Sequence, residues 1–120
     1  MRGRLDVMTT TQALDEATQG FLKALASETR QQMLLLFAGD AELTVGEIAT
    51  RSGLSQSTTS EQLALLRRGG LVTSRRDGKL VRYRVDPEAM GVRLQQLQAY
   101  LTVCCPPASL APTGETGPPR

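Results

Sequence analysis

The chain has 120 residues, with 14 Lys and Arg, 12 Asp and Glu, no histidine and two cysteines. This length holds one small domain. No apolar run approaches the roughly 18 residues of a membrane helix, and no apolar segment follows Arg2 and Arg4 as in a signal peptide, so we expect a cytoplasmic protein with no membrane partner and with reduced thiols.

Half of the Lys and Arg residues lie between residues 67 and 84, and the rest of the chain is net acidic. The cations of this basic segment are Arg67, Arg68, Arg75, Arg76, Lys79, Arg82 and Arg84. Asp77 is the one anion among them. A local basic block in a near-neutral chain favours a polyanionic partner, and the alternative is an ordinary solvated face.

Residues 1–11 are polar and unpatterned, which predicts a flexible arm. Apolar residues at helical spacing then predict a first helix over roughly residues 11–25. The stripe consists of Leu14, Ala17, Phe21 and Leu25. Ser27 is a suitable cap for a second helix, which we expect to end at Gly39.

Two further helices are predicted before the basic segment ends. Thr44 and Glu47 form the capping box of a third helix, which Gly53 closes. Ser55 caps a fourth, QSTTSEQLALLRR, which ends at Gly69. The residues expected to face the core are Thr59, Leu63 and Leu66.

The runs LVTSRR and KLVRYRV read as two short strands, separated by Asp77 and Gly78. This dipeptide predicts a hairpin, because Gly tolerates the positive φ that such a turn requires. We expect Arg75, Arg76 and Lys79 to cluster around the hairpin tip.

Asp86 and Pro87 begin a last helix. Its apolar stripe runs through Met90, Leu94, Leu97, Leu101 and Cys104. Nothing else in the chain is an obvious partner for this stripe, so we expect a homodimer formed through the terminal helices. Residues 12–105 would form the domain, and the Pro- and Gly-rich residues 106–120 a disordered tail.

Two helices joined by the short turn RSGLS form a helix-turn-helix pattern, and the hairpin that follows is then a wing. The fourth helix begins with short polar side chains that are mediocre helix formers but suit base edges in a major groove. The candidate DNA-reading residues are Gln56, Ser57, Thr58, Ser60 and Glu61. Arg75, Arg76 and Lys79 would contact phosphates beside them.

Several stretches resemble the ArsR/SmtB family of winged-helix repressors. They are LKALASETR (22–30), LTVGEIATRSGLSQSTTSEQLALLRRGGLVTSRRDGKLVRYRV (43–85) and the closing helix. The resemblance implies a mainly α fold with a β-hairpin wing, in the order α-α-α-α-β-β-α. It also implies a homodimer that binds double-stranded operator DNA and releases it when an inducer binds.

Carried over by position, the resemblance places Gln56, Ser57 and Ser60 at base edges, and Arg76 and Lys79 on the DNA backbone. The chain departs from the family at Glu61, where relatives often carry Arg or His. A carboxylate there repels phosphates, although it can accept a hydrogen bond from cytosine N4.

The family's sensor sites can be compared with this sequence. Zinc-type sites use His with Asp or Glu, and this chain has no histidine, so we expect no zinc site and no required cofactor. A second type carries Cys-x-Cys at the third helix, which here has no cysteine. Cys104 and Cys105 remain as the candidate inducer ligands.

Adjacent cysteines make a poor disulfide, because their Cα atoms lie ~3.8 Å apart, below the usual range of about 4.4–6.8 Å. Pro106 should end the helix at Cys105, so that the second thiol can swing towards the first. Two such thiolates suit a trivalent arsenical or antimonite. Arsenite prefers three thiolates and the chain offers no third, so the third ligand would come from a small thiol, from the partner subunit or from an organic substituent already on the arsenic. The last option makes an organic species such as methylarsenite a specific candidate.

Other readings stay open. The same cysteines can serve a repressor that senses oxidants or reactive sulfur, and Cys104 alone can simply continue the apolar stripe. A thiol enzyme is set aside, because a nucleophilic cysteine needs a neighbouring base or cation, and Arg93 is the nearest cation in sequence. A winged helix used only for protein contacts would leave the basic hairpin unexplained.

Overall fold

The computed structural model describes residues 13–106. The expected arm over residues 1–11 and all but the first residue of the expected tail lie outside this range. By its internal contacts the chain divides into two units. Residues Asp15–Arg93 form one of them, and the described stretch from Leu94 onward belongs to the other.

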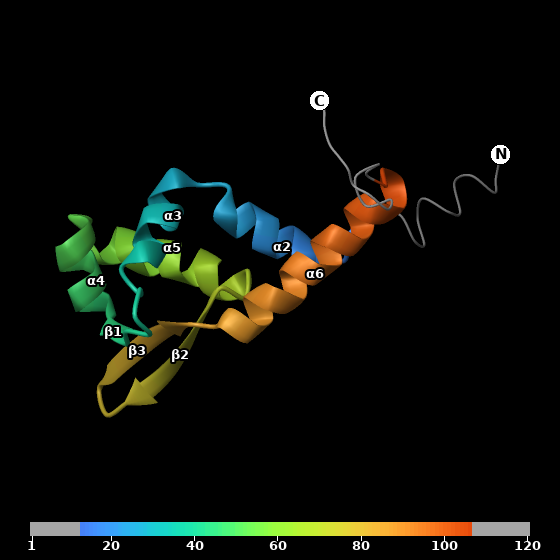
Figure 1. Ribbon diagram of the computed structural model, residues 1–120. Helices are drawn as coiled ribbons and strands as arrows, with labels where there is room; N and C mark the ends of the chain where they lie inside the picture. The colour runs from blue at the N-terminus through green and yellow to red at the C-terminus, as the bar shows by residue number, and fades with distance from the viewer. Residues whose placement is uncertain (1–12, 107–120) are drawn as a thin grey trace. The chain divides into compact units, whose positions relative to one another are not determined.

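The described elements are α2 (Glu16–Leu25), α3 (Glu28–Leu35), β1 (Leu43–Thr44), α4 (Val45–Ser52), α5 (Gln56–Arg68), β2 (Val72–Asp77), β3 (Leu80–Val85) and α6 (Pro87–Cys104) (Figure 1). This order confirms the predicted helical fold with a hairpin wing after the fourth helix. The structure adds the short strand β1, which the sequence did not predict.

Helix α2 begins later than predicted, because Asp15 caps it. The Asp15 carboxylate accepts a hydrogen bond from the Thr18 backbone N–H at 3.1 Å. Phe21 is buried as expected, but Thr18 rather than Ala17 completes the buried side of the helix. Burial of Thr18 is tolerated because its hydroxyl is hydrogen-bonded to Arg93 at 3.3 Å.

Ser27 caps α3 as predicted, by accepting a hydrogen bond from the Arg30 backbone N–H at 3.3 Å. The helix ends at Leu35 rather than beside Gly39. The next residues continue as tight turns, in which the N–H groups of Leu36 and Phe37 bond to carbonyls three residues earlier at 3.0 and 3.1 Å.

Arg30 joins three helices of this unit. Its guanidinium donates to the backbone carbonyls of Ala24 and Lys23 at the end of α2, at 2.7 and 3.1 Å. It also donates to Gln62 Oε1 of α5 at 2.8 Å. The guanidinium therefore binds carbonyls at the C-terminal end of α2, where the Lys23 carbonyl also accepts the Ala26 N–H at 3.2 Å.

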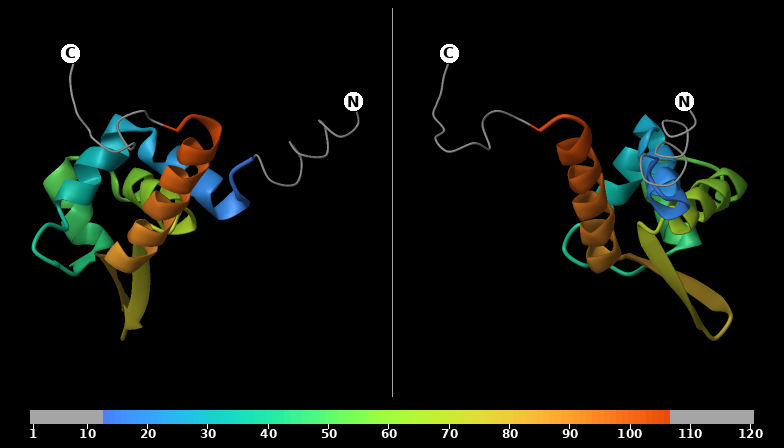
Figure 2. Two further views of the ribbon diagram at one scale, coloured as in Figure 1. Left: turned by 45° about the vertical axis from the view of Figure 1, so that its right-hand side comes forward. Right: turned by 90° about the vertical axis from the view of Figure 1, so that its right-hand side faces the viewer.

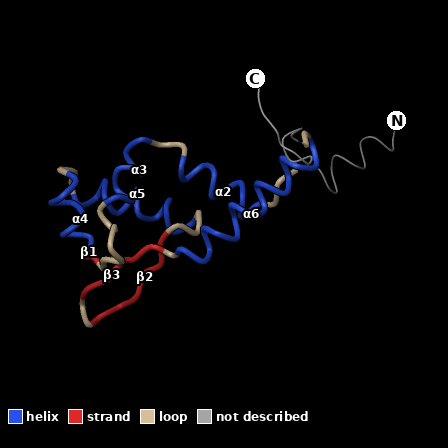
Figure 3. The backbone as a smooth tube through the Cα atoms, in the orientation of Figure 1, coloured by secondary structure: helices blue, strands red, loops and turns tan. Residues whose placement is uncertain are grey.

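The three strands form one antiparallel sheet in the order β1-β3-β2 (Figure 3). Asp77 pairs with Leu80, so the two-residue turn of the hairpin is Gly78-Lys79. Gly78 has the positive φ, 66°, that the turn requires. The predicted hairpin is thus confirmed, with its turn one residue later than expected.

The core is enclosed by α2, α3, α4 and α5 and by the end of the sheet that carries Leu43 and Val72. Its buried apolar side chains include Phe21, Met33, Phe37, Ile48, Leu63, Leu66, Leu71 and Val72. Thr59, Leu63 and Leu66 are fully buried, as predicted for the inner side of the fourth helix. This packing fixes which side of α5 remains exposed.

Helix α6 carries none of the buried residues in the described part of the chain. Met90 packs partly against the core, whereas Leu94 and Leu101 keep 54% and 51% of their surface exposed. The apolar stripe predicted for this helix is therefore partly covered at Met90 and about half exposed at Leu94 and Leu101. No described helix is long and apolar enough to span a membrane.

Candidate nucleic-acid interface

The helix-turn-helix consists of α4, a three-residue turn and α5. Thr44 and Glu47 form the predicted capping box at the start of α4: the Thr44 N–H donates to Glu47 Oε1 at 2.9 Å, and the Glu47 N–H to Thr44 Oγ1 at 3.2 Å. The hydrogen bond from the Thr44 N–H lowers the pKa of Glu47. Gly53 ends α4 with a φ of 74°, as predicted.

The start of α5 presents most of the predicted DNA-reading residues to solvent. Ser55 caps the helix by accepting a hydrogen bond from the Thr58 N–H at 3.1 Å. Gln56, Ser57, Ser60 and Glu61 are exposed, whereas Thr58 is half-buried. Because residues three and four positions apart share one side of a helix, Ser57, Ser60 and Glu61 lie together on the exposed side.

The wing has two sides that differ in their charged neighbours. Side chains alternate between the faces of a strand, and directly paired residues of neighbouring strands share a face. The register therefore places Ser74, Arg76, Val81 and Tyr83 on one face, here called the inner face. Arg67 of α5 donates to Ser74 Oγ at 3.3 Å, which shows that this face lies towards α5.

The opposite face, here called the outer face, carries Thr73, Arg75, Asp77, Leu80, Arg82 and Arg84. Each of its three arginines is paired with a carboxylate at 2.8 Å: Arg75 with Glu42, Arg82 with Asp77, and Arg84 with Asp40. These pairs lower the pKa values of Glu42 and Asp77, first through the hydrogen bonds from Arg75 and Arg82.

The structure thus separates the three predicted phosphate-binding residues. Arg76 is exposed on the inner face, and Lys79 is exposed in the turn. Within residues 13–106 neither of them enters an ion pair. Arg75 points to the outer face and is held by Glu42. In the views of Figure 2 the hairpin extends beyond α4 and α5, so its tip is open to a partner.

Sequence reasoning missed the carboxylates Asp40 and Glu42, which neutralise two of the wing arginines. They precede the helix-turn-helix and lie 44 and 33 residues from Arg84 and Arg75. No local pattern marks such distant pairs. The sequence analysis counted charges only within residues 67–84, where cations outnumber anions, and so did not include Asp40 and Glu42 as partners for the wing arginines.

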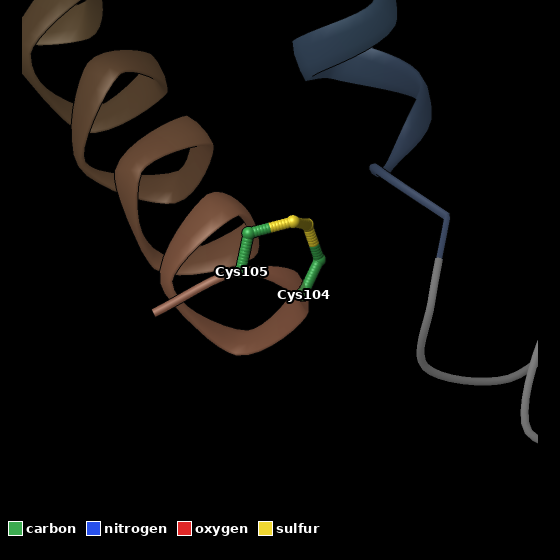
Figure 4. The surroundings of a disulfide bond; sticks show 2 residues. All are labelled: Cys104 and Cys105. Atoms are coloured by element: carbon green, nitrogen blue, oxygen red, sulfur yellow. A yellow bond between two sulfur atoms is a disulfide. The ribbon is translucent and has the colours of Figure 1, made fainter. Parts of the chain in front are cut away.

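The cysteine pair differs from its prediction. Cys104 and Cys105 are joined by a disulfide, with their Cα atoms 3.8 Å apart, whereas two thiols were expected (Figure 4). The reason is the end of α6: the helix stops at Cys104, and Cys105 occupies a bend before Pro106. The two side chains are therefore no longer held about 100° apart as neighbours within a helix are.

Comparison with known proteins identifies the family. The pattern described as "Bacterial regulatory protein, arsR family" matches residues 27–74. The transcriptional activator HlyU of Vibrio cholerae serotype O1 is 42% identical over 76 residues, which cover 63% of this chain and 69% of HlyU. The chain belongs to the arsR family. Because these relatives are transcriptional regulators, the expectation that the protein is not an enzyme is confirmed.

Two further similar proteins bear on the function. The arsenic resistance transcriptional regulator ArsR1 of Pseudomonas putida is 46% identical over 66 residues, which cover 55% of this chain and 52% of ArsR1. The homodimeric winged helix-turn-helix DNA-binding domain Mb0332 of Mycobacterium bovis is 35% identical, with a TM-score of 0.59 over 72% of this chain and 81% of that one.

The arsR-family pattern ends at residue 74, before the free cations of the wing and before the cysteine pair. It covers the helix-turn-helix entirely, because α4 and α5 lie inside residues 27–74. The DNA-binding element of this chain is therefore the part that the family defines, and the two cysteines lie outside it.

Proposed function

We propose that the protein is a transcriptional repressor that binds double-stranded operator DNA through α5 and the wing. The observation that carries this proposal is the exposed polar side of α5 beside the inner face of the wing. Ser57 and Ser60 offer hydrogen bonds to base edges, while Arg76 and Lys79, which enter no ion pair within residues 13–106, supply positive charge for phosphates. As a DNA-binding regulator it would act in the cytoplasm.

The binding form is a homodimer joined through the α6 helices. Leu94, Leu101 and Val103 are 51–72% exposed, which is a large apolar surface for one helix. The same apolar residues of α6 in a second copy of the chain would cover this surface. The solved relative Mb0332 is a homodimer. Two recognition helices would then read half-sites about one helical turn, ~34 Å, apart.

Fluorescence anisotropy tests the DNA-binding proposal directly. Labelled double-stranded DNA from the region upstream of the protein's own gene is titrated with wild type and with Ser57→Ala/Ser60→Ala, at several salt concentrations. Loss of preference over a scrambled duplex in the variant, with an unchanged salt slope, is the expected result. Equal binding of both duplexes by wild type would overturn sequence-specific repression.

The inducer we propose is a trivalent arsenical held by the reduced Cys104–Cys105 pair. The disulfide supports this, because two sulfur atoms that reach each other can also reach one shared atom. In the disulfide neither sulfur is a thiolate, so the pair must first be reduced to the dithiol by a cellular thiol, two equivalents of which are oxidised to their own disulfide. A methylated or aryl arsenical needs only these two thiols, since its third bond is to carbon.

A second candidate signal is oxidation itself. The observation that favours it is the disulfide, which gives the chain two covalent states at the same residues. HlyU also has a solved structure in a form described as reduced, with 38% identity and a TM-score of 0.53 over 70% of this chain and 88% of that one. DNA release by an oxidant without arsenical would support redox sensing, and release of the reduced protein by methylarsenite alone would support arsenical sensing.

A further inference from the structure

Arg75 is bound to Glu42 through the same N–H groups that a DNA phosphate would use. Its Nε lies 2.8 Å from Glu42 Oε2, and its Nη2 lies 2.9 Å from Glu42 Oε1. Such a two-point contact is the strong form of an arginine–carboxylate pair, and phosphates are bound with the same geometry. Arg75 therefore cannot offer this edge to Glu42 and to a phosphate at the same time.

The sheet fixes Glu42 in this position. Glu42 directly precedes β1, whose Leu43 pairs with Tyr83 of β3. Arg75 and Arg82 are directly opposite each other in the register of β2 and β3, where two like charges repel. Glu42 relieves this repulsion from one side, so the pair has a structural reason to persist in the free protein.

The exposure of the two side chains makes them available to a partner. The Arg75 side chain is 56% exposed and that of Glu42 is 30% exposed. A phosphate that approached Arg75 would have to displace the carboxylate, whereas Arg76 and Lys79 are exposed and enter no ion pair within residues 13–106. The wing therefore contains two kinds of cation. Arg76 and Lys79 can contact a phosphate directly, whereas Arg75 must first lose its ion pair with Glu42.

We propose that Glu42 limits the DNA affinity of the wing by keeping Arg75 in an internal ion pair, which leaves the backbone contacts to Arg76 and Lys79. This inference rests on the proposed function, that the chain binds DNA through α5 and the wing. Glu42 is thus a residue that tunes DNA binding without touching DNA.

The consequence is measurable as a salt slope. Each phosphate that a cation neutralises steepens the dependence of log K on log salt by about 0.9. Glu42→Gln would release Arg75 to a phosphate, because a neutral amide holds a guanidinium far less strongly than a carboxylate does. One added contact corresponds to roughly 5- to 10-fold tighter binding at about 0.1 M salt.

The experiment compares four proteins on the same labelled upstream duplex by anisotropy, between about 50 and 200 mM salt. They are wild type, Glu42→Gln, the double variant Glu42→Gln/Arg75→Gln, and the control Glu88→Gln. The control removes the same charge from an exposed residue that enters no ion pair within residues 13–106. The double variant has the net charge of wild type. Circular dichroism verifies that all four fold.

We expect tighter binding and a steeper slope for Glu42→Gln, and a return to wild-type affinity and slope in the double variant. The inference is overturned if Glu42→Gln matches Glu88→Gln, or if the double variant keeps the gain, since the gain would then come from the lost carboxylate alone. A wild type that shows no salt-dependent binding would instead overturn the proposed function.

Discussion

Gly69, at the end of α5, lies so close to Ala24 of α2 that a Cβ atom on it would be 2.7 Å from the Ala24 Cβ. The same atom would lie 2.9 Å from the carbonyl oxygen of Gly20. The φ of Gly69 is −81°, an ordinary value for any residue, so the constraint is space rather than backbone conformation. This close approach sets how α5 crosses α2, and therefore how the DNA-reading side of α5 is oriented.

Gly69→Ala is expected to destabilise the protein by about 1–3 kcal/mol, the usual effect of forcing an extra group into packed backbone. The matched control is Gly91→Ala in α6, where a Cβ would meet nothing within 4 Å. That control should be neutral or stabilising by up to about 1 kcal/mol, because Ala is the better helix former. Urea unfolding at pH 7 measures both, and equal midpoints would contradict the steric account.

Asp15 predicts a specific acid dependence of stability. The Thr18 hydroxyl and backbone N–H and the Arg93 guanidinium lower the pKa of this carboxyl below its usual value. In the acid range the unfolded chain therefore binds more protons at this residue than the folded chain does. The stabilisation is present above the unfolded pKa and is lost as the pH falls through the folded pKa.

Asp15→Asn tests this dependence, because asparagine also caps helices but carries no charge. We expect the variant to lose less of its melting temperature than wild type between pH 6 and pH 3. The melting temperature followed by circular dichroism across that range is the measurement. Parallel curves for the two proteins would show that Asp15 does not contribute to the acid sensitivity.

The local sequence predicted the features of the fold that depend on neighbours in the chain. The capping box of Thr44 and Glu47, the αL glycine at Gly53 and the cap at Ser55 each need only residues within one helical turn. Together they placed the helix-turn-helix correctly. The exposed side of α5 followed, because its buried side was predicted from Thr59, Leu63 and Leu66.

Features that depend on distant residues were not predictable in the same way. The strand β1 has two residues and exists only because β3 lies beside it. The pair of Arg75 with Glu42 joins residues 33 positions apart, so the sequence predicted a phosphate contact for Arg75 but not its carboxylate partner. The sequence predicted the helix end at Cys105 and the Cα separation of 3.8 Å, but a disulfide was not expected because that separation lies below the usual bridging range.

The two faces of the wing predict unequal effects of removing an arginine. Arg76→Gln removes an inner-face cation that enters no ion pair in the described part of the chain, so the salt slope of DNA binding should fall by about 0.9 and affinity by roughly 5- to 10-fold at about 0.1 M salt. Arg84→Gln removes the same charge from the outer face, where Arg84 is already paired with Asp40. Its slope should equal that of wild type. Anisotropy titrations measure both, and a larger effect of Arg84→Gln would reverse the assignment of the faces.

The cysteine pair predicts arsenical binding only in its reduced state. With phenylarsine oxide as the probe, two thiols form two As–S bonds and release one water, so intact mass spectrometry should show one arsenic per reduced chain. The diamide-oxidised chain should show none, since its sulfur atoms are bonded to each other.

Cys105→Ser separates the dithiol from a single reactive thiol. With one thiol left the variant cannot chelate, so its adduct should be lost on dilution, whereas the control Thr102→Ser keeps both thiols and should retain it. An adduct of equal stability in Cys105→Ser would show that Cys104 binds without its neighbour. Chelation by the two thiols would then no longer account for arsenical binding.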